Sequence, residues 1–171
     1  MNQTFFQSFL DKTYEPEGLP KDYPVPVKEG LLFYIQRNQN INTVVYEINL
    51  NSHGDWNLDE PMKVYWIKYN EFQEEAELNY IQNKLAYGYR SNIISPELVE
   101  FEFVSYNKKF YIRKQKNSIF EVTTRLSGKL ARLTNMYVYA EEFGVFPEVK
   151  FVELYGICVE TDCPCYEKII P

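Results

Sequence analysis

Apolar and polar residues alternate along most of this chain, and the clearest alternation lies between residues 31 and 69. Successive side chains of a strand point to opposite faces, so residues two apart share a face. Turn-forming residues separate the apolar runs, which is typical of short strands. Because consecutive strands joined by short loops usually pair as neighbours, the pattern predicts an antiparallel meander. The expected strands are 31–37, 44–50 and 62–69.

The same alternation returns further along the chain after one interruption. Between residues 71 and 85, Phe72, Ala76, Ile81 and Leu85 recur at helical spacing. Four glutamates crowd the start of this stretch, where the helix dipole favours negative charge. The pattern therefore predicts one helix over 71–85. Further strands are expected at 85–90, 99–103, 109–113, 120–126, 129–142, 149–159 and 165–170.

This succession of elements predicts a mainly β fold. Nine or ten short antiparallel strands with one inserted helix are typical of a β-barrel or a β-sandwich. A closed barrel would remove the exposed edges of the sheet. The alternation alone does not choose between the two architectures.

The chain divides into a short arm and one domain. Residues 15–28 hold four prolines and a glycine, and proline favours extended backbone without regular pairing. We therefore expect residues 1–28 to form an extended arm on a single β domain of residues 29–171. The chain has no apolar run long enough to span a membrane, and its start does not resemble a signal peptide. These features predict the cytoplasm, or export if the natural start has been trimmed.

Charge narrows the range of partners. The chain carries a net charge of −6, which argues against a general nucleic-acid-binding protein. Residues 108–132 nevertheless carry a net charge of +7, and this basic segment predicts an acidic partner. Lys109, Arg113 and Arg125 are expected to face outward there. Alternatively, glutamates on the neighbouring strand neutralise them by ordinary cross-strand pairing.

Arg37 and the asparagines that follow it are the most suggestive polar group. The alternation places Arg37 on an apolar strand face, where a guanidinium needs a partner. Either an anionic or polar ligand binds it there, or Arg37 extends from the strand end to water or pairs with an internal carboxylate such as Glu47. Several aromatic residues either line a cavity for a small polar ligand or pack in the core. The candidate ligand-binding residues are Arg37, Asn38, Asn40, Tyr46, Trp66 and Tyr87.

No motif for catalysis or cofactor binding is present. The single histidine, His53, gives no basis for nucleophilic catalysis. Cys158, Cys163 and Cys165 form an odd, clustered set, compatible with structural thiols, with one disulfide between Cys158 and Cys163, or least well with metal ligands. We therefore predict no catalytic residues, no metal and no cofactor, and favour a protein that is not an enzyme.

The runs at 33–38, 44–47, 61–69, 85–89 and 149–156 resemble an uncharacterised bacterial β-rich domain family of unknown function. This family is loosely associated with chains that also carry an inositol-oxygenase-like domain. The resemblance implies a polyol or polyol phosphate as ligand and carries no activity, since one histidine is too few for a non-haem iron site. We expect a non-enzymatic domain that binds a small polar or anionic ligand. The alternative is a protein-interaction module that uses the basic surface of residues 108–132.

Overall fold

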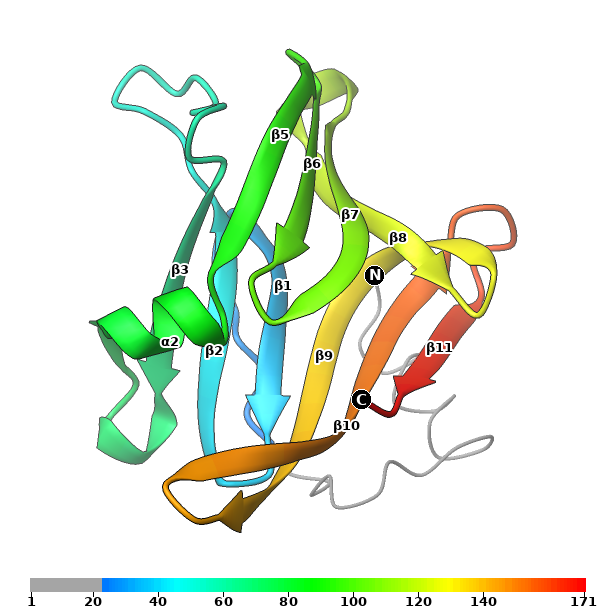
Figure 1. Cartoon of the computed structure of the whole chain (residues 1–171). Helices are drawn as coiled ribbons and strands as arrows, with labels where there is room; N and C mark the ends of the chain where they lie inside the picture. Colours follow the sequence, from blue (N-terminus) through cyan, green and yellow to red (C-terminus); the bar gives the residue numbers. More distant parts are fainter. Residues whose placement is uncertain (1–22) are drawn as a thin grey trace.

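Eleven strands form one continuous sheet in the part of the chain that the computed structural model describes, residues 23–171 without the side chains of Phe143 and Phe146. The sheet curls into a half-barrel (Figure 1). Three short helical elements interrupt the strands: η1 (Tyr69–Glu71), α2 (Tyr80–Leu85) and η2 (Lys116–Ser118). The strands are β1 (Leu31–Arg37), β2 (Asn40–Ile48), β3 (Met62–Lys68), β4 (Glu74–Glu77), β5 (Tyr89–Ser95), β6 (Leu98–Phe103), β7 (Tyr106–Lys114), β8 (Phe120–Leu126), β9 (Lys129–Phe143), β10 (Phe146–Cys158) and β11 (Pro164–Ile169).

The predicted mainly β fold and the antiparallel meander of β1, β2 and β3 are confirmed, but the expected closed barrel or sandwich and the expected all-antiparallel pairing are wrong. The strands form one curled sheet rather than a closed barrel or a two-sheet sandwich. Their order is β4-β3-β2-β1-β9-β8-β7-β6-β5, and β10 and β11 extend from β9. β1 runs parallel to β9, pairing residues 34–37 with 135–138. The sheet is therefore mixed, because its two meanders are joined through β9 rather than through a hairpin.

β9 carries two different partners on one edge. β10 pairs along almost the whole of β9, so β8 and β1 must share the opposite edge. β8 pairs with residues 129–132 and β1 with residues 135–138. We call the point between them the fork. Gly156 on β10 lies beside it, where a Cβ would meet the Arg132 carbonyl oxygen at 2.5 Å. Only glycine permits this close approach of the two backbones.

Only the end of the predicted helix over 71–85 is helical. Asn79 caps the short helix α2 with its side chain, while the glutamate-rich part before it forms the edge strand β4. Pairing with β3 outweighs the helical preference of the glutamates, since tertiary context commonly overrides propensity. Of the apolar residues at helical spacing, Phe72, Ile81 and Leu85 are exposed, whereas Ala76 packs against the core from β4.

The core lies on the concave side of the half-barrel and is rich in aromatic rings. Phe33 of β1 is fully buried and stacks on Tyr46 of β2, with ring centroids 4.3 Å apart. Phe101 and Phe110 also stack, with centroids 5.2 Å apart. Burying each such side chain contributes about 1.5–3 kcal/mol to stability. These contacts fix β1 and β2, and so position the residues at their ends.

The described end of the predicted arm lies along β1. Pro24 accepts a hydrogen bond from the Gln36 side chain at 3.1 Å, and the Tyr23 hydroxyl donates to the Arg37 carbonyl oxygen. Residues 1–22 of the arm lie outside the described residues. The three cysteines are free thiols. Within residues 23–171, none of the helices has the length and apolar character needed to cross a membrane.

Candidate ligand-binding site

Arg37 lies at the end of β1, where the hairpin register places it opposite Asn40. Its guanidinium carbon lies 4.5 Å from the centroid of the Trp66 ring. Arg37 Nη2 donates a hydrogen bond to Asn40 Oδ1 at 2.9 Å. A guanidinium above an indole ring is held by cation–π attraction. We use the name Arg37 corner for Arg37, Asn40, Trp66 and Tyr87.

Arg37 forms no ion pair with any carboxylate of the described residues. The alternative that paired it with Glu47 is wrong, because the register places Glu47 opposite Leu31 at the other end of β1. Glu47 instead accepts a hydrogen bond from the Tyr65 hydroxyl at 2.6 Å. Arg37 Nε is buried without an acceptor, and such a donor costs about 1–3 kcal/mol. The corner therefore has a charge and a donor that these side chains do not satisfy.

Tyr87 forms a second wall of the corner. Its ring meets the Trp66 ring edge to face, with centroids 5.4 Å apart. Burial raises the pKa of the Tyr87 hydroxyl, and the charge of Arg37 and a hydrogen bond with its side chain oppose this rise. The Tyr46 hydroxyl donates to the Tyr87 carbonyl oxygen at 2.6 Å. Tyr46 is fully buried, so it fixes the position of Tyr87 from inside the core.

Gln82 ties α2 to the Arg37 corner. Its Oε1 accepts a hydrogen bond from Trp66 Nε1 at 3.1 Å and another from the Asn79 backbone at 2.9 Å. One side chain thus completes the helix cap and orients the indole on which Arg37 lies. Sequence reasoning missed Gln82, although an asparagine three residues before a glutamine is a recognisable capping signal.

The remaining asparagine of the candidate set has a different role. Asn38 exchanges two hydrogen bonds with the Ala140 backbone, each 2.8 Å long, and so extends the pairing of β1 with β9. Asn40 Oδ1 accepts a second hydrogen bond, from the Asn42 backbone at 3.0 Å. The structure therefore brings together Arg37, Asn40, Trp66 and Tyr87, with Tyr46 behind them and Asn38 directed to β9.

The basic residues Lys109, Arg113 and Arg125 are partly occupied by partners within the chain. Lys109 forms ion pairs at 2.7 and 3.7 Å with the two outward glutamates of β6, Glu100 and Glu102. The hydrogen bond from Lys109 holds the pKa of Glu100 below its usual value. Arg113 Nε donates to the Thr123 hydroxyl at 3.1 Å, and Arg125 donates to a turn carbonyl at 3.1 Å.

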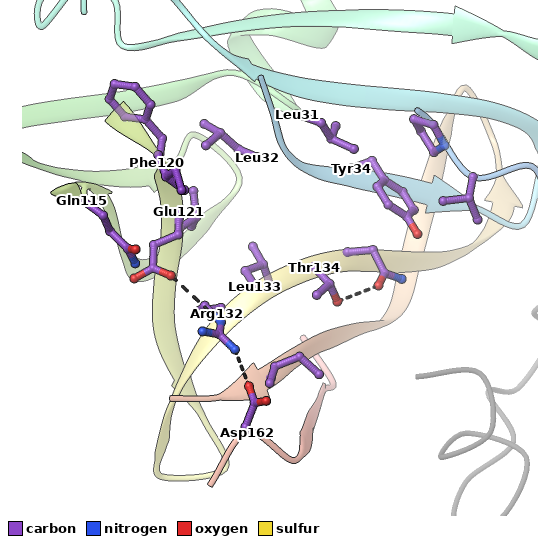
Figure 2. A pocket seen from close by; sticks show the side chains of 16 residues that line it. Leu31, Leu32, Tyr34, Gln115, Phe120, Glu121, Arg132, Leu133, Thr134 and Asp162 are labelled. Atoms are coloured by element: carbon purple, nitrogen blue, oxygen red, sulfur yellow. Dashed lines mark hydrogen bonds and ion pairs between the residues drawn. The ribbon is translucent and has the colours of Figure 1, made fainter. Parts of the chain in front are cut away.

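A groove of about 1040 Å³ opens at the fork. Its lining comes from β1, β8 and β9, together with residues before β1 and around η2 (Figure 2). Figure 2 shows Leu133 and Thr134 in the middle of the groove, with Tyr34 to one side. None of the six candidate ligand-binding residues lines it.

Arg132 closes one end of the groove between two acids. Its Nη2 lies 2.6 Å from Asp162 Oδ1, and its Nε lies 4.0 Å from Glu121 Oε2. Figure 2 shows the guanidinium bracketed by these two carboxylates. Its charge is balanced within the chain, so this end of the groove has no net attraction for an anion. Sequence reasoning missed the groove because its walls come from strands far apart in the chain.

Comparison with known proteins identifies the family. The family model described as "Domain of unknown function (DUF4833)" matches residues 33–168, which span β1 to β11. The chain belongs to this family. No curated protein and no solved structure matches the chain. The family description assigns no activity, so the polyol ligand implied by the resemblance stays a prediction.

Proposed function

We propose that this member of the DUF4833 family is a non-enzymatic domain that binds a small anionic ligand at the Arg37 corner. The observation that carries the proposal is the state of Arg37. Its guanidinium is stacked on Trp66 and has no carboxylate partner among the described residues. A half-buried cation without a counter-charge attracts an anion, since the surrounding low dielectric strengthens the interaction.

The geometry favours a carboxylate or phosphate group. Both match the planar fork of a guanidinium, which donates two parallel hydrogen bonds to them. The contact with Trp66 and the hydrogen bond to Asn40 restrict the guanidinium, which reduces the side-chain entropy that binding costs. The Tyr87 hydroxyl beside Arg37 supplies another polar group. A polyol phosphate, one of the ligands that the resemblance implies, carries such an anionic group.

Inorganic phosphate is the simplest probe of this proposal. The chain has two tryptophans, so a Trp56→Phe background makes Trp66 the single fluorescent reporter. We expect phosphate to change Trp66 emission with saturation, because it binds the guanidinium that lies on the indole. In that background Arg37→Gln is expected to weaken the apparent affinity by about tenfold or more, which corresponds to about 1.4 kcal/mol.

Arg132→Gln is the matched control, because it removes the same charge from the arginine that Asp162 and Glu121 already balance. Its phosphate affinity is expected to stay unchanged. An equal response in the Arg37→Gln and parent proteins would contradict the proposal. A flat titration in the parent would contradict it as well.

The alternative function, interaction with an acidic protein through residues 108–132, has weaker support. Arg113 and Arg125 have no ion pair among the described residues, but Lys109 is already neutralised by two glutamates. The free charge on this surface is therefore smaller than the segment's sequence indicates.

A further inference from the structure

The segment from Phe72 to Leu85 exposes large apolar side chains to an unusual degree. Phe72 is fully exposed, and Tyr80, Ile81 and Leu85 are each more than half exposed. α2 buries none of its side chains. Figure 1 shows this helix outside the half-barrel, next to β2 and β3. Exposed apolar groups of this size are expected where another molecule covers them.

The backbone around Phe72 is also strained. Phe72 and Gln73 both have positive φ, at 56° and 62°. A bulky residue in the left-handed region is rare, and such strain persists mostly at functional positions. Within the described residues, the Phe72 ring gains no burial that would offset the strain. The turn therefore presents an aromatic ring to solvent.

β4 beside this turn is an open edge of the sheet. Among the described residues it pairs only with β3, so its other edge has unpaired backbone groups. Three of its four residues are glutamates. Like charges would oppose pairing of this edge with the same edge of a second copy. The acidic edge is open only to a strand of opposite charge.

The register of β4 shows which faces such a strand would meet. Glu75 and Glu77 lie opposite Ile67 and Tyr65 of β3, on one face. Ala76 lies opposite Trp66 on the other face, which Glu74 shares, and packs against the core. Lys28 already forms an ion pair with Glu75, whereas Glu74 and Glu77 form none among the described residues. An added strand would therefore meet only acids, Glu75 and Glu77, on one face, and Ala76 together with Glu74 on the other.

We propose that the β4 edge, together with Phe72 and α2, docks an extended segment of another protein in which lysine or arginine residues alternate with apolar residues. The segment adds to β4 as a further strand, so that main-chain hydrogen bonds supply affinity and alternate side chains supply specificity. Its basic residues face the glutamates, and its apolar residues face the core side. Phe72 acts as the aromatic anchor. The proposal is independent of the ligand at the Arg37 corner.

A synthetic peptide of alternating lysine and valine, carrying a fluorescent label, is the probe. We expect saturable binding to the full chain, measured by fluorescence anisotropy. Phe72→Ser and the double change Glu75→Lys with Glu77→Lys, the two acids on one face of β4, are each expected to weaken the affinity by about tenfold or more. The matched control is Glu142→Lys with Glu160→Lys, two exposed acids elsewhere. It alters the net charge equally and is expected to weaken binding much less.

Backbone methylation tests the added strand. Methyl groups on alternate peptide nitrogens of the probe block one edge of the peptide, and shifting them by one residue blocks the other edge. Binding should be lost for one methylated form and kept for the other. The proposal would be overturned if the two glutamate double variants lost affinity for the peptide equally. It would also be overturned if either Phe72→Ser or methylation left that affinity unchanged. Binding would then be charge attraction alone.

Self-association is the remaining outcome. If the chain alone forms dimers in sedimentation experiments, and Phe72→Ser abolishes them, then a second copy occupies this surface and the proposed basic partner is wrong.

Discussion

Two arginines with opposite surroundings distinguish two regions of this molecule. Arg132, at the end of the groove, lies between Asp162 and Glu121. Arg37, at the end of β1, lies on an indole ring, donates one hydrogen bond to Asn40 and has a buried Nε without an acceptor. The groove at the fork therefore contains the balanced charge, and the Arg37 corner outside it contains the unbalanced one.

The comparison shows that the surface shape and the charge distribution favour different binding sites. The shape favours the groove at the fork, and the charge favours the Arg37 corner. A groove favours binding because it removes ligand surface from water. An unpaired guanidinium favours binding because it supplies a charge that only an anion satisfies. If the Arg37 corner is the site, then changes there should alter anion affinity and have separable effects on stability. Three predictions test this separation.

The largest expected effect is the loss of stability when Trp66, whose ring lies under Arg37, is replaced by alanine. Trp66 is almost fully buried, so Trp66→Ala should lower the free energy of unfolding by about 3–5 kcal/mol. Urea denaturation followed by circular dichroism measures this change. Trp66→Phe keeps an aromatic face and should cost much less while still weakening the hold on Arg37. A small cost for Trp66→Ala would show that the corner packs loosely.

A smaller effect on the free energy of unfolding is expected when either arginine is replaced by methionine, and its direction should differ between the two arginines. Arg132→Met removes partly exposed ion pairs, so it should lower the free energy of unfolding by up to about 1 kcal/mol. Arg37→Met removes a half-buried charge that lacks a counter-charge, so it should leave stability unchanged or raise it by about 1 kcal/mol. Paired urea denaturation curves measure both. A large loss for Arg37→Met would indicate that Arg37 is a structural residue.

The smallest effect concerns the titration of Tyr87. Burial raises the pKa of its hydroxyl above the usual value of about 10. Its contribution to stability is therefore complete below about pH 10 and is lost as pH rises through the folded pKa. Since Arg37 opposes the rise, Arg37→Met should raise the Tyr87 pKa further. Arg132→Met should not.

Ultraviolet absorbance of tyrosinate measures this shift. The chain has fifteen tyrosines, so the titration must be compared in proteins with and without Tyr87→Phe. A Tyr87 pKa that does not respond to Arg37→Met would show that the two groups are not coupled as the structure indicates.

Local patterns predicted most of the strands, because most of them have one buried face. The strand expected at 85–90 is wrong: the strand there, β5, begins at Tyr89 and is almost entirely exposed. The alternation of Val99, Phe101 and Phe103 with glutamates led directly to β6, whose residues alternate in burial in the same way. Arg37 was also correctly placed at the end of its strand. These features depend on residues close together in sequence, so a single chain contains the information.

Features that join residues far apart in sequence could not be predicted, because local patterns contain no information about them. The parallel pairing of β1 with β9 joins residues about a hundred positions apart, and nothing in either strand specifies that partner. The groove at the fork follows from this pairing, so it was missed as well. The helix over 71–85 failed because pairing with β3 decided the structure of β4, whatever its local propensity.

The shared edge of β9 also sets an order for folding. β1 to β4 can pair as one meander and β5 to β8 as another, but neither meander can join the other until β9 exists. On a ribosome that adds roughly 5–20 residues per second, the free edge of β1 therefore waits on the order of 5–20 s for its partner. During that interval the rings of the two meanders can already meet, as Phe33 meets Phe101, but the edge of β1 that later pairs with β9 has unpaired backbone groups. Nascent chains are thus most open to aggregation, and most in need of chaperones, shortly before residue 143 leaves the exit tunnel.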